Sequence, residues 1–158
     1  MTRAIVIYHS LFGNTEAIAT QLAEGLKENG IETSCVGIDN VELNQLATYD
    51  FIAIGGPTHM IGLSRQMKAF LRKLKTVDLR GLKGFSFDTR NKSRMNSKLW
   101  LMFENSAARK IEGKMKKMKV QIIHPRHSAI VEGREGPLDQ NAELTFKELG
   151  KEIASLIS

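Results

Sequence analysis

Short runs of consecutive apolar residues alternate along the chain with segments in which apolar residues recur every three or four positions. The first run, over residues 4–8, reads Ala-Ile-Val-Ile-Tyr and has no charged residue in it. An uninterrupted apolar run of this length is typical of a strand that is buried on both faces of a sheet. Further strands are predicted over residues 33–38, 51–54, 84–88 and 120–123. After a break at Pro125, residues 129–131 are predicted to prolong the last of these strands.

The segments between these runs have the periodicity of amphipathic helices. In the first of them, Ile18, Leu22 and Leu26 share one face, and Gly30 then follows as a helix terminator. This alternation of strands and helices predicts an α/β fold, a three-layer sandwich in which helices cover both faces of a five-stranded parallel sheet. In such sheets ligands bind beyond the carboxyl ends of the strands. Helices are predicted over residues 15–29 and after Ser64, Ser106 and Asp139.

The composition fits one globular domain, because 42% of the 158 residues are hydrophobic and 25% are charged. We therefore expect residues 1–158 to form a single domain. Cys35 is the only cysteine, which excludes a disulfide framework and a multi-cysteine metal site and favours a reducing, cytoplasmic location. His124 and His127 have no cysteine or carboxylate at ligand spacing and are interpreted as part of a surface turn. No apolar stretch is long enough to span a membrane, and the early first strand leaves no room for a signal peptide.

The charge balance favours acidic partners. The chain has 23 Lys and Arg against 17 Asp and Glu, a formal net charge of +6. Part of this excess lies in the basic run of residues 114–119, which is interpreted as a solvated helix face or, alternatively, as a docking patch for an acidic redox partner. Nucleic-acid binding is not predicted, because no aromatic residues interleave with these lysines.

The loop after the first strand suits a phosphate group. It contains Ser10, Gly13, Asn14 and Thr15 and leads into a helix whose N-terminal N–H groups and dipole favour an anion. The polar side chains can donate hydrogen bonds, and the glycine allows the backbone to form an anion-binding nest. The loop has no lysine and no GxGxxG pattern, which favours a phosphomonoester over a nucleoside triphosphate or a dinucleotide. An ordinary strand–turn–helix junction capped by Asn14 or Thr15 is the alternative.

Three loops taken together resemble those of the flavodoxin family. Residues 10–15, Ser-Leu-Phe-Gly-Asn-Thr, are similar to its FMN phosphate loop, T/S-x-T-G-N-T, with Phe12 in place of a hydroxyl residue. Residues 55–60, Gly-Gly-Pro-Thr-His-Met, resemble the second flavin loop, and residues 87–90, Phe-Asp-Thr-Arg, resemble the third. The segment 132–138 also looks like the corresponding part of short-chain members. The resemblance spans almost the whole chain.

This resemblance implies a sheet order of 2-1-3-4-5 and an electron-transfer protein that binds FMN non-covalently and exchanges electrons with a redox partner protein. The first loop would hold the ribityl phosphate through Ser10, Leu11, Phe12, Gly13, Asn14 and Thr15. The second would cover one face and the dimethylbenzene side of the ring through Pro57, Thr58, His59, Met60, Ile61 and Gly62. The third would cradle the pyrimidine edge through Asp88, Thr89 and Arg90.

Two departures from the family pattern keep alternatives open. Flavodoxins usually sandwich the ring between aromatic residues and are acidic, whereas this second loop offers His59 and Met60 and the chain is basic. Trp100 or Phe103 are candidates for stacking on the ring. One alternative is an FMN-dependent reductase that passes hydride from NAD(P)H to a quinone, and another is a flavin-free binding module that keeps only the fold. Because Arg90 would stabilise negative charge on the ring, we expect easier full reduction than in acidic flavodoxins.

Overall fold

Strands and helices alternate along the chain, as the pattern of apolar residues predicts. The protein is described by a computed structural model over residues 1–59, 62–92 and 106–158. The elements are β1 (Arg3–Tyr8), α1 (Asn14–Glu28), β2 (Glu32–Gly37), β3 (Phe51–Pro57), α2 (Arg65–Leu74), β4 (Lys83–Asn91), α4 (Ala107–Lys117), β5 (Gln121–Ile122), β6 (His127–Val131) and α5 (Ala142–Ile157). Two 3-10 turns, Ile38–Asn40 and Leu43–Thr48, connect β2 to β3.

The strands form one sheet in the order β2-β1-β3-β4-β5, and neighbouring strands run parallel. This confirms the predicted fold class and strand order. The fifth position of the sheet is divided, since β5 pairs with the start of β4 and β6 pairs with its end. The predicted continuation after Pro125 is therefore β6, and proline at the break is expected because it has no N–H to donate to a ladder.

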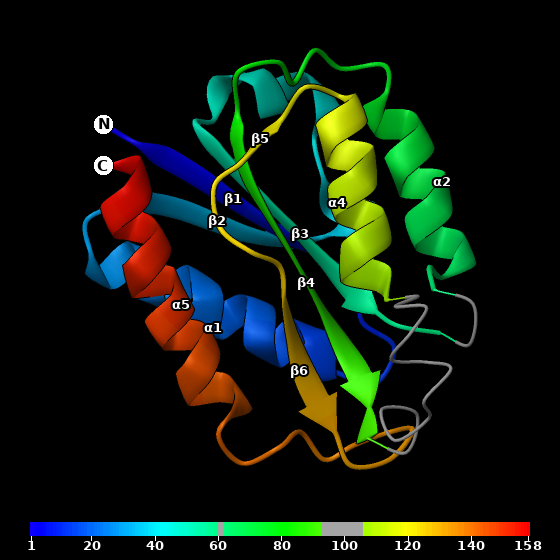
Figure 1. The fold of residues 1–158 in the computed structure, drawn as a ribbon. Coiled ribbons are helices and arrows are strands. Elements are labelled where there is room, and N and C mark those ends of the chain that lie inside the picture. Colours follow the sequence, from blue (N-terminus) through cyan, green and yellow to red (C-terminus); the bar gives the residue numbers. More distant parts are fainter. Residues whose placement is uncertain (60–61, 93–105) are drawn as a thin grey trace.

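Helices cover both faces of the sheet (Figure 1). Helices α1 and α5 lie on one face and share a core with Val6, whereas α2 and α4 lie on the other and share a core with Ile5 and Ile7. Successive residues of a strand point to opposite faces. Because helices cover both faces, the residues of β1 from Ala4 to Tyr8 are apolar whichever face they point to, which explains the continuous apolar run in the sequence.

The helix N-termini near the carboxyl edge of the sheet differ in how they are capped. Ser64 caps α2 by accepting a hydrogen bond from the Met67 N–H at 3.1 Å, and Ser106 caps α4 in the same way, with the Arg109 N–H at 3.1 Å. Helix α1 begins after Gly13, which supplies no side-chain cap, and of its first-turn N–H groups that of Glu16 donates to the Ser10 Oγ at 3.3 Å. Among the residues described, none of the helices has both the length and the apolar character needed to cross a bilayer.

Candidate cofactor site

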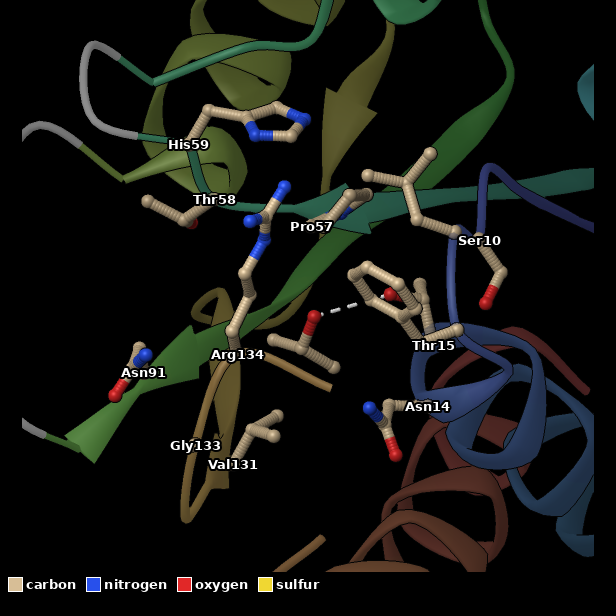
Figure 2. A pocket seen from close by; sticks show the side chains of 13 residues that line it. Ser10, Asn14, Thr15, Pro57, Thr58, His59, Asn91, Val131, Gly133 and Arg134 are labelled. Carbon is tan, nitrogen blue, oxygen red and sulfur yellow. Dashed lines mark hydrogen bonds between the residues drawn. The ribbon is translucent and has the colours of Figure 1, made fainter. Parts of the chain in front are cut away.

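A cavity of about 470 Å³ lies where the loops after β1 and β3 meet the end of β4 (Figure 2). Its size falls within the range of about 300–1,000 Å³ that is usual for small-molecule sites. The structure brings together residues of all three predicted loops. Those that line the cavity are Ser10, Leu11, Phe12, Asn14 and Thr15 of the first loop, Pro57, Thr58 and His59 of the second, and Thr89 of the third.

The first loop presents an open backbone turn at the start of α1. Gly13 has a φ of 90° in the left-handed region, and a Cβ built there would meet no heavy atom within 4 Å. The Ser10 Oγ accepts hydrogen bonds from the N–H groups of Gly13 at 3.1 Å and Glu16 at 3.3 Å. The Ser10 hydroxyl proton therefore remains available to a ligand. A helix N-terminus whose first turn is only partly capped, with a hydroxyl donor beside it, is suited to an anion.

Two predicted phosphate donors also hold the loops together. The Asn14 Nδ2 donates to the Glu135 carbonyl at 3.0 Å, which fixes the segment 132–138 against the first loop. Thr15 is buried, and its hydroxyl lies 3.0 Å from that of Thr89, as the dashed line in Figure 2 marks. If Thr89 donates to Thr15, the Thr15 proton is free to point elsewhere. Roles of Asn14 and Thr15 toward a phosphate stay predictions.

Leu11 and Phe12 form an apolar rim of the cavity. Each residue is 46% exposed, although both are large and hydrophobic. Phe12 occupies the position where the family pattern has a hydroxyl residue, so it adds apolar surface where the pattern would add a donor. Exposed apolar side chains beside a cavity are a common feature of ligand sites.

The second loop is tied to the N-terminus of α4 through one threonine. The Thr58 hydroxyl donates to the Asp88 Oδ2 at 2.8 Å and accepts from the Ala107 N–H at 3.0 Å. The Thr58 N–H donates to the Thr89 carbonyl at 2.9 Å. Thr58 therefore lines the cavity, but its hydroxyl proton is already used within the protein.

His59 and Gly62 close the second loop. Each donates its backbone N–H to the carbonyl of the other, at 2.8 Å and 3.0 Å. Gly62 has a φ of 98°, a conformation that glycine adopts without strain. The predicted ring-binding residues Met60 and Ile61 lie outside the described residues, as do Trp100 and Phe103.

Asp88 and Arg90 do not line the cavity, although the third loop was expected to use them. Strand β4 extends to Asn91, beyond the predicted end at Asp88, so residues 88–90 alternate between the faces of the sheet. Thr89 points to the cavity and α1, whereas Asp88 faces α4 and accepts a hydrogen bond from the Ala108 N–H at 3.1 Å. Asp88 is fully buried, and burial raises its pKa, although the hydrogen bonds that it accepts act in the opposite direction.

Arg134 enters the cavity in place of the predicted Arg90. Figure 2 shows its guanidinium extending toward Pro57, Thr58 and His59. The segment that carries it folds back through the Glu132 N–H, which donates to the Pro137 carbonyl at 2.9 Å. The segment 132–138 resembles the family in sequence, but nothing in the sequence indicates that β6 leads it to the cavity. Asn91, Val131 and Gly133 are further lining residues that it missed.

The histidine pair near Pro125 lies away from the cavity, and both residues are half-buried; His127 begins β6, so the prediction that both lie in a surface turn is wrong for it. His124 packs edge-on against Phe85, and His127 packs edge-on against Phe146. Burial lowers the pKa of His127, so its imidazole is neutral at neutral pH. Across the residues described, no three His, Cys, Asp or Glu side chains converge in a way that could hold a metal ion.

The fold and the cavity define a doubly wound α/β protein with a ligand site where the winding reverses between β1 and β3. The family model described as Flavodoxin matches residues 6–148, and the chain therefore belongs to the flavodoxin family. Proteins of this family bind FMN as their cofactor. The residues present fit that group, because the partly capped α1 N-terminus suits its phosphate and the apolar rim suits its ring.

Similarity to individual proteins agrees with this assignment. The chain is 34% identical over 88 residues to "Probable flavodoxin 1" of Bacillus subtilis (strain 168), covering 55% of this chain and 56% of that protein. It is 30% identical over 102 residues to "NAD(P)H dehydrogenase (quinone)" of Cupriavidus metallidurans, covering 52% and 51%. The chain thus spans about half the length of the curated relatives it matches.

Solved structures share the fold over nearly the whole chain. A flavodoxin from the domain Archaea superposes with a TM-score of 0.80 at 22% identity, covering 99% of both chains. Oxidised Flavodoxin 1 from Bacillus cereus superposes with a TM-score of 0.81 at 21% identity, covering 99% of this chain and 100% of that one. At such identities the likeness concerns the fold.

Proposed function

We propose that this chain binds FMN non-covalently and carries electrons to and from a redox partner protein. The observation that carries the proposal is the partly capped start of α1, which opens on a cavity of about 470 Å³ with the Ser10 hydroxyl beside it. Bound FMN would supply the redox chemistry. The protein would supply binding, exclusion of water and local charge.

The phosphate would be held at the first loop. There the backbone N–H groups of the first turn of α1 and the Ser10 hydroxyl converge, and the helix dipole favours a negative charge. Gly13 keeps the approach open, because no side chain stands above the turn. Leu11, Phe12 and Pro57 would exclude water from the ring.

Arg134 would set the charge next to the ring. Among the described residues that line the cavity, Arg134 is the one arginine or lysine, and its guanidinium reaches into the cavity. A positive charge stabilises the negative charge that reduction adds, so Arg134 would ease full reduction. Much of the Arg134 side chain is exposed, and solvent weakens this effect. The role first expected of Arg90 is thereby assigned to Arg134.

Titration of the apoprotein with FMN tests the proposal. We expect quenching of flavin fluorescence with one FMN per chain and much weaker binding of riboflavin, which lacks the phosphate. A protein that binds neither flavin would instead be a binding module that keeps only the fold. Equal affinity for both flavins would contradict the assignment of the first loop.

A flavin-dependent reductase is the second candidate, supported by the similarity to proteins named NAD(P)H dehydrogenase (quinone). Such an enzyme needs a ring face that is open to the nicotinamide. The two candidates separate when the FMN-loaded protein is mixed anaerobically with NADH or NADPH. Bleaching of the flavin without any added reductase would favour the reductase, and an unchanged spectrum would favour the carrier.

We further propose that residues 1–158 act as one domain in the cytoplasm and that the redox partner is acidic. That the sequence holds a single cysteine, which can form no internal disulfide, supports a reducing compartment. Burial raises the pKa of the Cys35 thiol to about 11, so the thiol stays protonated and unreactive. The net charge of +6 supports an acidic partner.

A further inference from the structure

A groove between α2 and α4 concentrates much of the positive charge. It lies on the sheet face opposite α1 and α5 (Figure 1), has a volume of about 450 Å³, and has Leu63, Leu71 and Gly113 in its lining. No acidic side chain is among the groove-lining residues that the structure describes. The six cations that line it are Lys68, Arg72, Lys75, Lys110, Lys114 and Lys117.

These cations form two matching rows. Residues 68, 72 and 75 follow the spacing i, i+4, i+7 along α2 and its C-cap, and residues 110, 114 and 117 repeat the same spacing along α4. Each row therefore places a charge about every turn, or about every 5.4 Å. Gly113 of α4 also lines the groove, and a Cβ there would meet no heavy atom within 4 Å, so the groove is open at that point.

Among the described residues, five of the six cations, all except Lys110, are not neutralised by neighbouring acids. Helix α2 has no acidic residue, and Glu112, the single acid of α4, pairs with Lys116 at 3.0 Å and Arg126 at 3.3 Å, away from the groove. Within the described parts of the chain, no ion pair involves Lys68, Arg72 or Lys75, or Lys114 or Lys117 of the facing row. Facing rows of like charge repel each other, and carboxylates placed between them would remove that repulsion.

The groove begins beside the candidate cofactor site. A Cβ built on Gly62 of the second loop would lie 2.8 Å from the side chain of Lys110, the first cation of the α4 row. The N-terminus of α4 is also joined to that loop, since the Ala107 N–H donates to the Thr58 hydroxyl. A protein seated in the groove would therefore lie next to the loop that is expected to cover the ring.

We propose that the groove binds an acidic helix of the protein with which this chain exchanges electrons. A helix that carries a carboxylate on each turn along both flanks would match the two rows, above a groove floor that the largely buried Leu63 and Leu71 make apolar. That the helix belongs to an electron-transfer partner rests on the proposed function; that the groove binds it does not. Bases of a single-stranded nucleic acid would find no aromatic side chain in the lining to stack on.

A fluorescent peptide can test the groove directly. The probe is a helical peptide of about five turns with Glu at i, i+4 and i+7 along two flanks and Leu between them. Its control has the same composition with the Glu residues distributed around the helix. Fluorescence anisotropy should show tighter binding of the patterned peptide by about tenfold, a difference of the size that aligned charge pairs can produce. Equal binding of both peptides would overturn the proposal.

Two kinds of variant locate the binding. Arg72→Glu with Lys114→Glu reverses one charge in each row and should weaken peptide binding at least about tenfold. Lys73→Glu with Lys151→Glu changes the net charge equally outside the groove lining and should leave binding within about twofold. Gly113→Phe retains every charge but fills the groove, and it should also weaken binding at least about tenfold. Far-UV circular dichroism checks the fold of each variant.

Three results would contradict the proposal. The first is an equal loss of peptide binding in Lys73→Glu with Lys151→Glu, and the second is full peptide binding by Gly113→Phe. The third is a single-stranded oligonucleotide that binds more tightly than the peptide and whose binding Arg72→Glu with Lys114→Glu abolishes. The last would identify a nucleic-acid site. FMN titration of the same samples separates the two proposals. Normal FMN binding without peptide binding overturns the groove proposal alone. Peptide binding without FMN binding overturns the proposed function, and with it the electron-transfer role of the partner, but leaves the groove as a site for an acidic helix.

Discussion

Replacement of Ser10 by alanine removes the hydroxyl at the centre of the first loop. In the structure the Ser10 Oγ accepts the N–H groups of Gly13 and Glu16, at 3.1 Å and 3.3 Å. The hydroxyl proton is the group expected to reach the phosphate. Ser10→Ala therefore loses one hydrogen bond to a charged oxygen and leaves two backbone donors to water.

The expected loss in FMN affinity follows from that single bond. A hydrogen bond to a charged group contributes about 1.5–3 kcal/mol, which is roughly a 10- to 150-fold weaker Kd. The apoprotein should lose less, about 1 kcal/mol, because the two donors are near the surface and water replaces the hydroxyl as a cap. Flavin fluorescence titration measures the first quantity, and thermal unfolding of the apoprotein measures the second.

Riboflavin provides the matched control, since it shares the ring and the ribityl chain but has no phosphate. Ser10→Ala should leave the weak riboflavin affinity within about twofold, because the lost interaction is with the phosphate alone. If riboflavin and FMN lost affinity by the same factor, the hydroxyl would act on the shape of the cavity and the phosphate assignment would be refuted. Undiminished FMN binding would refute it equally.

Further predictions concern charge, packing and pH. Arg134→Gln should make full reduction of bound FMN harder and weaken binding of reduced FMN more than of oxidised FMN, as potentiometric titration would show. Gly113→Ala should stabilise the fold by about 1 kcal/mol, because a Cβ there would meet open space. Gly150→Ala should destabilise the fold by about 1–3 kcal/mol, because a Cβ there would lie 2.9 Å from a backbone nitrogen of α1. Urea unfolding measures both changes. Asp88→Asn should gain stability relative to wild type as the pH rises from about 4 to 7. The raised pKa means that the wild-type fold is favoured with Asp88 protonated and loses that contribution as the carboxyl ionises, which urea unfolding at both pH values checks.

The fold was predictable because its main determinants are local. The run at residues 4–8 is apolar throughout because helices cover both faces of β1, and the caps at Ser64 and Ser106 lie where the sequence places hydroxyl residues before helical periods. The C-terminal end of β4 was harder to predict from the sequence. Its pairing with β6 carries it to Asn91, and nothing in residues 84–91 alone indicates that distant partner.

The same non-local pairing explains which site residues were missed. With β4 assumed to end at Asp88, residues 88–90 looked like a loop whose side chains could all reach a ligand. In the continuous strand, alternation turns Asp88 away from the cavity and leaves Thr89 in it. Arg134 reaches the cavity because β6 runs beside β4 and Asn14 binds the Glu135 carbonyl, two contacts between segments far apart in the sequence.

The position of the charges matters more for function than their sum. A net charge of +6 says only that anions are favoured, whereas the structure places Arg134 in the cavity and six cations along one groove. The two sites meet at the second loop, where Thr58 is bonded both to Asp88 of the sheet and to Ala107 of α4. A partner that displaced α4 would thus act on the wall of the cavity through two hydrogen bonds of 2.8 Å and 3.0 Å, which makes this threonine a direct physical connection between the two sites.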